Sequence, residues 1–409
     1  MFLKKIVCAL TVAALLSIAA APASAFIADG GDPYCAITGV RDGAARFRQT
    51  MGPAEAGLSL DAAAVMLVER ETGEVLYEDN ADDLRPIASI TKVMTMILVM
   101  EAVEAGHITL EDEVVVTEHA YSMGGSQIWL EPGEIMTVDE LFRAVAVQSA
   151  NDAAVALAEH VSGGEETFVA EMNRKAAELG MTKTTFKNAC GLDEEGHLST
   201  ARDVAIMSRD CLRHELVRKY VTIWMDELRG GETSLANTNK MLRTFNGMTG
   251  LKTGTTSKAG VCISASAKRD GMELIAVVLG SSDSKSRFAA ARDLLEFGFA
   301  NYELADVDVN PVDISPVKVK LGEVEYCDYI YDVPEYVVVD RGKGGSVSYS
   351  VEMAETQAAP VEKGQTVGEI TVYSEGIVIG VYPITATQRI EKLKFGSSYK
   401  MLFESLLSI

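Results

Sequence analysis

The sequence has too little positive charge for a protein that binds a polyanion. Its 37 Lys and Arg residues are outnumbered by 59 Asp and Glu residues, which gives a formal net charge of −22. Binding to nucleic acid depends on neutralising its phosphates with basic side chains. We therefore expect no nucleic acid partner, and solubility alone is a sufficient reason for an acidic balance.

Cysteine and histidine are also scarce. Of six cysteines, Cys8 lies in the N-terminal segment discussed next, and the odd number that remains is too scattered for a disulfide scaffold: Cys35, Cys190, Cys211, Cys262 and Cys327. The five histidines are dispersed, and "HELVR" at His214 lacks the second histidine of a zinc-binding helix. We expect neither a metal nor another cofactor, and we interpret His160 and His197 as ordinary helix and loop residues.

Long apolar runs are missing except at the N-terminus. There Lys4 and Lys5 precede an apolar run at residues 6–20, which is followed by the small residues Ala23-Ser24-Ala25. This order is typical of a secretory signal. Because the run is shorter than the roughly 20 residues that a spanning helix needs, we favour a cleaved signal at residues 1–25 over a retained anchor, and an extracytoplasmic location.

Repeats are absent too, and the 409 residues, 48% of them hydrophobic, are enough for two or three domains. Residues 26–58 are Gly- and Ala-rich and form an N-terminal arm. In residues 59–304, strand patterns at both ends enclose a helical middle. We expect an α+β domain with an antiparallel sheet built from distant segments, a helical subdomain beside it, and the site in the groove between the two. The short Val-, Tyr- and Thr-rich runs of residues 305–388 predict a small all-β domain.

Local signals predict several element boundaries. Thr72-Gly73 and Asp270-Gly271 lie between strand-like runs and indicate hairpins. A helical pattern starts at Ser89 and stops at Gly106, a suitable C′ glycine. Capping patterns and apolar periodicity predict further helices: one after the capping box Thr137–Glu140, then residues 152–161 and 165–179, one after Thr200, and residues 285–302.

Residues 86–100, "PIASITKVMTMILVM", begin an otherwise apolar helix with a serine and a lysine. Ser89 and Lys92 are three residues apart and so share one helix face. A neutral lysine can accept a serine proton, and burial or a second cation would lower its pKa. The Ser-x-x-Lys pattern also occurs at Ser282, Ser315 and Ser397, but only the copy at Ser89 opens a long apolar helix.

Two other segments are ambiguous when each is taken alone. In "QSANDAA", Ser149 and Asn151 lie in a break between helices, where Asn151 could simply cap the next helix. In "GLKTGTTSKAG", Lys252 could supply a fixed cation, and Gly254 could let a ligand approach the backbone. The ordinary alternative for the second segment is an edge strand with a glycine bulge.

Together, Ser89-Ile-Thr-Lys92, Ser149-Ala-Asn151 and Lys252-Thr-Gly254 resemble the three signatures of the penicillin-binding serine acyl transferases. Over residues 62–302 the flanking text is similar to the low-molecular-weight D-alanyl-D-alanine carboxypeptidases, as in "FKNACGLDEEGHLSTARDVA" and "NTNKML". This resemblance implies a penicillin-binding/β-lactamase-like fold, followed by a small all-β domain. It also implies removal of the terminal D-alanine from peptidoglycan stem pentapeptides, with β-lactams as covalent inhibitors and a role in cell-wall maturation.

The resemblance also implies roles for individual residues. Ser89 would attack the D-Ala-D-Ala carbonyl, Lys92 would accept its proton, and Ser149 would relay a proton to the leaving D-alanine. The substrate-binding set would hold the peptide backbone, form the oxyanion hole with the backbone N–H groups of Ser89 and Thr255, and attract the terminal carboxylate: Asn151, Lys252, Thr253, Gly254, Thr255 and Arg287. Lys252 would also help to keep Lys92 neutral. Some relatives carry His where Thr255 stands and Arg where Thr238 stands, so carboxylate recognition is the least fixed part.

Two alternatives have weaker support. A class A β-lactamase shares the three signatures but needs a Glu-x-x-Leu-Asn segment for deacylation, and the candidate region "EETFVAEMN" lacks the Leu-Asn pair. A noncatalytic penicillin-binding sensor or wall-structural protein would have lost at least one catalytic position, and none is lost.

The C-terminal residues 389–409 predict an amphipathic helix. Their apolar side chains recur at three- and four-residue steps, whereas Lys392, Lys394 and Lys400 lie opposite or at the flanks. The apolar set is Phe395, Tyr399, Leu402, Phe403, Leu406 and Ile409. The segment is too short to span a bilayer, so we expect it to lie at the outer face of the cytoplasmic membrane. Packing on the β domain is the alternative.

Overall fold

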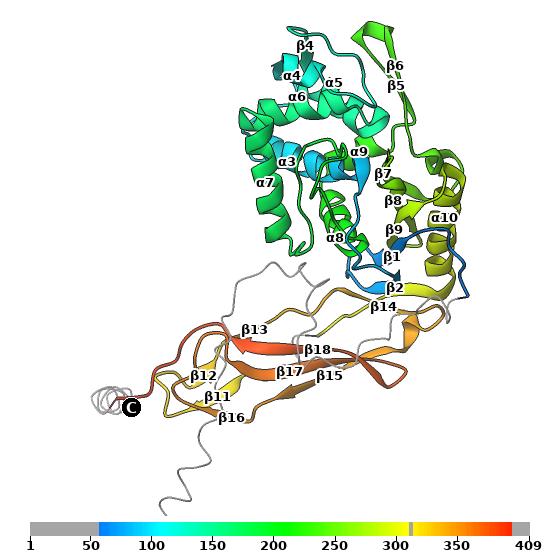
Figure 1. The fold of residues 1–409 in the computed structure, drawn as a ribbon. Coiled ribbons are helices and arrows are strands. Elements are labelled where there is room, and N and C mark those ends of the chain that lie inside the picture. The colour runs from blue at the N-terminus through cyan, green and yellow to red at the C-terminus, as the bar shows by residue number, and fades with distance from the viewer. Residues whose placement is uncertain (1–56, 311–313, 395–409) are drawn as a thin grey trace, which may run out of the picture. The chain divides into compact units, whose positions relative to one another are not determined.

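The computed structural model describes residues 57–310 and 314–394 (Figure 1). The expected signal peptide, nearly all of the N-terminal arm and residues 395–409 of the expected amphipathic helix lie outside these residues. The described part contains a sheet with helices and, closer to the C-terminus, a region made almost entirely of strands. It therefore agrees with the α+β class expected from the sequence.

One five-stranded antiparallel sheet joins segments from both ends of the α+β domain predicted at residues 59–304. Its order is β2-β1-β9-β8-β7, with β1 (Ala64–Glu69), β2 (Val75–Asp79), β7 (Met248–Thr256), β8 (Gly260–Arg269) and β9 (Met272–Ser281). Both predicted hairpins are confirmed, with left-handed backbone at Gly73, Asp270 and Gly271. This order leaves β7, which carries the Lys-Thr-Gly segment, as an edge strand.

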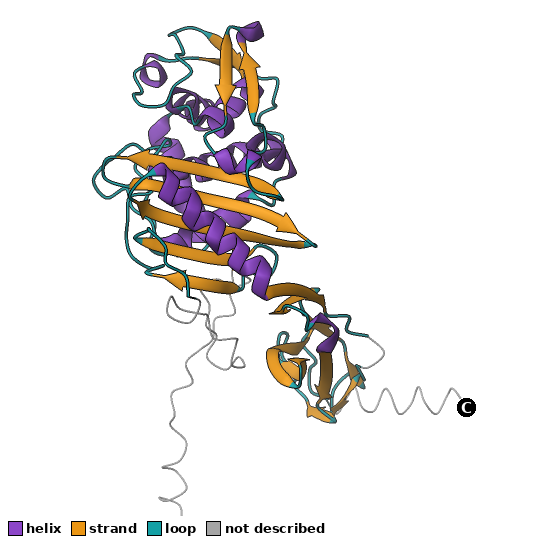
Figure 2. Cartoon of the chain, turned by 90° about the vertical axis from the view of Figure 1, so that its right-hand side faces the viewer, coloured by secondary structure: helices purple, strands orange, loops and turns teal. Residues whose placement is uncertain are grey.

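Both faces of this sheet are covered, and its neighbouring strands β1 and β9 are almost continuously apolar. Val65 and Leu67 of β1 pack in a core with helix α10 (Ser284–Asn301), which lies across one face (Figure 2). Met66 and Val68 point to the opposite face and join the core of the helical region. On α10, a Cβ at Gly298 would lie 2.4 Å from Leu274 Cδ1, so glycine permits close contact between helix and sheet.

The helical middle begins with a tight turn. The predicted helix at Ser89 starts as a 3₁₀ turn, η1 (Ala88–Thr91), and continues as α3 (Lys92–Glu104), which is buried on most sides. Then follow α4 (Glu118–Tyr121), α5 (Val138–Arg143), the π-helical η2 (Ala144–Gln148), α6 (Asn151–Ser162), α7 (Glu165–Glu178), α8 (Ala201–Cys211) and α9 (Glu215–Val221). The intervening short elements are β3 (Glu113–Val115) with β4 (Ile135–Thr137), β5 (Met225–Leu228) with β6 (Thr233–Ala236), η3 (Arg229–Gly231) and η4 (Lys240–Arg243).

The capping residues predicted from the sequence lie at the helix ends of the structure. Thr137 and Glu140 form both hydrogen bonds of the capping box at the start of α5. The Thr200 hydroxyl accepts from the Asp203 N–H at the start of α8. Gly106 follows α3 with a φ of 70°, as expected of a C′ glycine.

The C-terminal region is built of strands, as expected. A four-stranded sheet has the order β13-β18-β17-β15, a three-stranded one β12-β11-β16, and β10 pairs with β14. The bounds are β10 (Tyr302–Asp306), β11 (Val317–Lys320), β12 (Tyr326–Cys327), β13 (Tyr329–Tyr331), β14 (Tyr336–Asp340), η6 (Gly344–Ser346), β15 (Val347–Met353), β16 (Thr356–Ala358), β17 (Thr366–Ser374) and β18 (Ile377–Ala386). Side chains such as Val339, Ile370 and Val372 form a core of their own.

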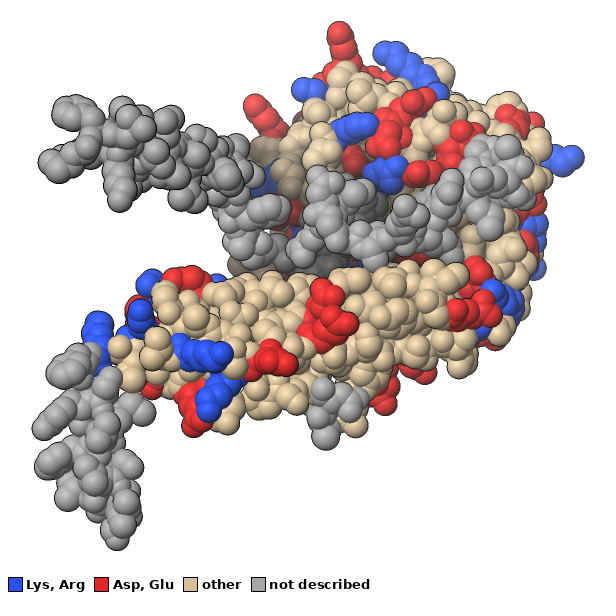
Figure 3. All heavy atoms as spheres, turned by 90° about the horizontal axis from the view of Figure 1, so that it is seen from below, with Lys and Arg blue, Asp and Glu red and all other residues tan. Residues whose placement is uncertain are grey.

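Cysteine pairing, membrane-spanning helices and the distribution of charge can be compared with the composition in the described residues. Cys190, Cys211, Cys262 and Cys327 are buried and free, whereas Cys35 lies outside the described range. No helix within residues 57–310 and 314–394 has the length and apolar character that crossing a membrane requires. On the face shown in Figure 3, acidic and basic side chains lie in small mixed groups among uncharged ones.

Candidate active site

Ser89 and Lys92 lie together at the start of α3. The Lys92 Nζ is 2.9 Å from the Ser89 Oγ, because the three-residue spacing across η1 and the first turn of α3 places both side chains on one face. Ser89 is partly exposed, whereas Lys92 is fully buried. A substrate can therefore reach the serine hydroxyl while the amine beside it is shielded from water.

Only neutral groups are hydrogen-bonded to Lys92. Besides Ser89, its Nζ donates to the Asn151 Oδ1 at 2.5 Å and to the backbone carbonyl of Cys190 at 2.6 Å. Burial lowers the pKa of Lys92 to about 8, an effect that the charges of Cys190 and Asp152 oppose. Two of its partners can only accept, so a neutral amine would give its two N–H groups to them and turn its lone pair toward Ser89.

Ser149 and Asn151 follow η2. Ser149 has left-handed backbone, with φ 65° and ψ 31°, and it is buried. Ala150 is the N-cap of α6 and Asn151 is its first residue, so the alternative that Asn151 merely caps this helix is wrong. Its amide instead joins two segments, because Oδ1 accepts from Lys92 and Nδ2 donates to the Gly124 carbonyl at 2.6 Å.

The edge strand β7 brings Lys252 and Gly254 to the same place. A Cβ at Gly254 would lie 2.9 Å from the Ser89 backbone nitrogen and 2.9 Å from the Ile87 carbonyl oxygen, so glycine is required for this close approach. The alternative for this segment, an edge strand with a glycine bulge, agrees with the structure at its start, because β7 is an edge strand and its register shifts between Met248 and Gly250. Gly254 lies in regular pairing opposite Cys262, so the close approach to Ser89, and not a bulge, accounts for glycine at that position.

Lys252 and Arg287 add two buried cations. Lys252 donates to the Thr253 carbonyl at 3.1 Å, and its pKa is well below the ordinary lysine value because of burial and the charges of Lys92 and Arg287. Arg287, near the start of α10, donates to the Gly254 carbonyl at 3.3 Å and the Thr255 Oγ1 at 3.4 Å. Burial lowers its pKa to about 10, and its Nε has no hydrogen-bond partner. This unbalanced positive charge favours an anionic ligand.

Several contacts in the site had no signal in the sequence motifs. The Cys190 and Gly124 carbonyls are acceptors for Lys92 and Asn151, and any residue type supplies a carbonyl. Thr253 donates its hydroxyl to Thr238 at 2.7 Å. Asp193 accepts from the Thr256 hydroxyl at 2.6 Å and so fixes the end of β7.

His197 is a buried loop residue beside the Ser-x-x-Lys turn. Its Nδ1 accepts from the Lys187 backbone N–H at 3.2 Å, so the ring proton is on Nε2, which is 2.8 Å from the Thr91 Oγ1. Burial lowers the pKa of His197 to about 4, and the ring is therefore neutral at physiological pH. Through its hydrogen bond to Thr91, the ring supports the turn that carries Ser89 and Lys92.

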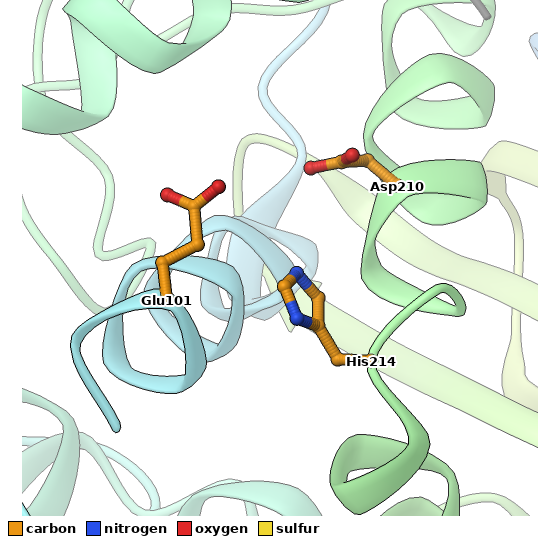
Figure 4. Close-up of side chains that lie close together, drawn as sticks. All are labelled: Glu101, Asp210 and His214. Atoms are coloured by element: carbon orange, nitrogen blue, oxygen red, sulfur yellow. The ribbon is translucent and has the colours of Figure 1, made fainter. Parts of the chain in front are cut away.

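One group of potential metal ligands exists in the described part of the chain. Glu101, Asp210 and His214 converge between α3 and the end of α8 (Figure 4). The Lys175 ammonium pairs with Glu101 and lies 3.6 Å from the Asp210 Oδ2. The chain therefore supplies its own cation to these carboxylates.

Comparisons with known proteins indicate the same family as the sequence motifs that form the site. Residues 49–283 match the profile of the family described as "D-alanyl-D-alanine carboxypeptidase", and residues 310–392 match that of "Penicillin-binding protein 5, C-terminal domain". The D-alanyl-D-alanine carboxypeptidase DacF of Bacillus subtilis is 40% identical over 353 residues, which cover 85% of this chain and 91% of that protein. DacC of Escherichia coli is 35% identical, over 82% of this chain and 85% of that protein.

Solved structures lead to the same group of proteins. Penicillin-binding protein 5 from Haemophilus influenzae superposes with a TM-score of 0.74 at 30% identity, covering 82% of this chain and 99% of that chain. Penicillin-binding protein D2 from Listeria monocytogenes, in a cefotaxime-bound form, has a TM-score of 0.55 at 35% identity. That match covers 59% of this chain and 98% of the other.

Proposed function

The chain belongs to the D-alanyl-D-alanine carboxypeptidase family of penicillin-binding proteins, and from this premise we propose that Ser89 is its nucleophile and Lys92 its general base. Proteins of this family are hydrolases that bind peptidoglycan peptides and β-lactams covalently. The observation that carries the proposal is the Lys92–Ser89 pair, 2.9 Å apart, in which the lysine is buried without an acidic hydrogen-bond partner.

The reaction would have two stages. Ser89 Oγ forms a bond to the carbonyl carbon of the penultimate D-alanine while its proton passes to the neutral Lys92. The C–N bond to the terminal D-alanine then breaks, and that amine takes up a proton, relayed through Ser149. Water afterwards attacks the ester, which releases the shortened peptide and restores the Ser89 hydroxyl.

Substrate binding would use the edge of β7 and its cations. An unpaired edge strand can accept a peptide as an additional strand. Lys252, Thr253 and Arg287 would attract the terminal carboxylate, and the unpartnered Arg287 Nε supports this role. The backbone N–H groups of Ser89 and Thr255 would form the oxyanion hole, which the close approach at Gly254 supports. Asn151 would hold the substrate backbone with its remaining N–H.

The test is release of D-alanine from a stem pentapeptide by the purified full chain, followed by chromatography of the tetrapeptide product. Stoichiometric release and covalent labelling by penicillin are expected. Rapid hydrolysis of penicillin without D-alanine release would instead identify a β-lactamase. Penicillin labelling with no peptide turnover would indicate a sensor.

Family members act on the cell wall, outside the cytoplasm. We further propose that residues 389–409 hold this chain at the outer face of the cytoplasmic membrane, on the sequence pattern alone, since residues 395–409 lie outside the described range. A chain lacking residues 395–409 should stay active on a soluble peptide and leave the membrane fraction. Continued sedimentation with membranes would exclude this segment as the anchor.

A further inference from the structure

Trp129 is displayed to solvent in an unusual backbone conformation. It is 78% exposed, the highest value among the exposed large hydrophobic residues of the described chain. Its φ is 59°, in the left-handed region that bulky side chains disfavour. Both neighbours are buried, Ile128 at 2% and Leu130 at 1% exposure, so the backbone holds the indole outward between two anchored residues.

Two charged side chains fix this conformation. The buried Asp152 carboxylate accepts from the backbone N–H of Ile128 at 3.1 Å and from that of Leu130 at 3.1 Å. The Arg229 guanidinium donates to the Ile128 carbonyl at 2.9 Å and lies 3.5 Å from the Trp129 carbonyl. The bonds on both sides of Trp129 thus resist relaxation of its backbone.

The same bonded unit includes the proposed substrate-binding Asn151. Asp152 directly follows Asn151, whose backbone N–H donates to the Ser126 carbonyl at 2.7 Å, three residues before Trp129. These hydrogen bonds therefore fix the Trp129 backbone relative to the residue that is proposed to hold the substrate backbone.

We propose that Trp129 forms a subsite for the stem-peptide residue that precedes D-alanyl-D-alanine, and this inference rests on the proposed function. Its ligand is a long aliphatic side chain that ends in an amine. The methylene groups would lie on the indole and the ammonium would gain a cation–π contact. The net charge of −22, taken over the whole chain, also favours the approach of a cationic ligand over that of an anionic one.

Intrinsic fluorescence tests occupancy without turnover. The chain has two tryptophans, and Trp224 is half-buried beneath Arg243, whose Cζ is 5.5 Å from the ring centroid. In a Ser89→Ala, Trp224→Phe double variant, Trp129 is the sole tryptophan. A pentapeptide with a free side-chain amine should shift its emission to shorter wavelength, and N-acetyl-D-alanyl-D-alanine should not. Saturable binding of the pentapeptide with unchanged emission would overturn the proposal.

Kinetics of an otherwise intact enzyme provide the second test. In Trp129→Ala, kcat/KM for the free-amine pentapeptide should fall about tenfold, as expected for loss of a cation–π and stacking contact. Cleavage of the N-acetyl dipeptide should stay unchanged, and Trp129→Phe should restore most of the loss. Equal losses on both substrates would overturn the proposal in favour of a structural role.

A third experiment distinguishes the side-chain amine from other groups that the indole could bind. Acetylating the side-chain amine of the pentapeptide should remove most of the difference between wild type and Trp129→Ala. If the difference arose only with a muramyl-linked peptide, the indole would be a sugar platform and the proposal would be wrong. Lack of D-alanine release by the wild type would instead count against the proposed function, and the fluorescence titration would still report on the subsite.

Discussion

A lysine lies at each end of helix α3, and the two lysines have opposite electrostatic surroundings. At its N-terminal end, Lys92 is buried with the neutral partners Ser89, Asn151 and Cys190, and burial lowers its pKa to about 8. At the other end, Lys175 from α7 pairs with Glu101 and Asp210. Burial opposes the charge of Lys175 as well, but the hydrogen bond to Glu101 and the nearby carboxylates raise its pKa.

This difference shows that counter-charge decides what a buried lysine can do. An ammonium beside carboxylates keeps its proton and serves as a structural cation. An ammonium that is buried and has only neutral hydrogen-bond partners gives up its proton readily and can serve as a base. On the proposed function, we call the Lys92 end of α3 the reactive end and the Lys175 end the inert end.

The largest effect is expected from removing the proposed nucleophile at the reactive end. Ser89→Ala deletes the oxygen that would bond to the substrate, so covalent labelling by a fluorescent penicillin should disappear, and D-alanine release should fall by several orders of magnitude. Circular dichroism would verify that the variant is folded. Stoichiometric labelling of this variant would contradict the assignment.

The next largest effect is expected when the same substitution, lysine to arginine, is compared at Lys92 and Lys175. Lys92→Arg keeps the positive charge but cannot provide a neutral amine, so penicillin acylation should slow by roughly 10²-fold or more. Lys175→Arg is the matched control, because an arginine still pairs with Glu101 and Asp210, and its acylation rate should stay within about twofold of wild type. Similar rates for both variants would remove the distinction between the two ends.

The sequence predicted the features that depend on local chemistry. The capping box at Thr137, the Asp270-Gly271 hairpin and the C′ glycine at Gly106 each follow from a few neighbouring residues, and all are present. The 3₁₀ turn at Ser89 did not follow from them, because it depends on a distant contact. A Cβ at Gly191 would lie 2.0 Å from the Ala88 carbonyl oxygen, so the turn is packed against the loop after Cys190.

The sequence predicted which side chains form the site, but it did not predict which backbone carbonyls contact them. Three motifs predicted residues that the fold brings together, among them Ser89, Lys92 and Asn151. The Cys190 carbonyl, which helps to orient Lys92, and the exposed Trp129 had no sequence signal. Carbonyl positions and side-chain exposure result from tertiary packing, which residue types alone do not specify.

The pH dependence of acylation would sharpen the comparison further. Since the pKa of Lys92 is about 8 and its neutral form is the proposed base, kcat/KM should rise about tenfold per pH unit up to roughly pH 8 and then level off. The rate of penicillin acylation between pH 6 and pH 9 measures this. Lys175→Arg should give the same profile as wild type. A flat profile over this range would mean that Lys92 is not the group whose deprotonation limits the rate.

The smallest effect is expected at the inert end. Lys175→Met keeps most of the aliphatic stem but removes the ammonium, which leaves the Glu101 and Asp210 carboxylates without this counter-charge. The free energy of unfolding should fall by about 1–2 kcal/mol at pH 7, because Lys175 is largely buried while Glu101 is partly solvated. Urea denaturation of wild type, Lys175→Met and Lys175→Arg measures this, and arginine should recover most of the loss.

The direction of the Lys175 pKa shift fixes how this difference changes with pH. A pKa raised in the folded protein gives stability that is fully present below the unfolded pKa of about 10.4 and is lost as pH rises through the folded value. The gap between wild type and Lys175→Met should therefore be constant from pH 7 to pH 9 and shrink above about pH 10.5. Penicillin acylation should stay within about twofold of wild type throughout. If Lys175→Met instead lost stability equally at all pH values, packing of the side chain, and not its charge, would account for the contribution of Lys175.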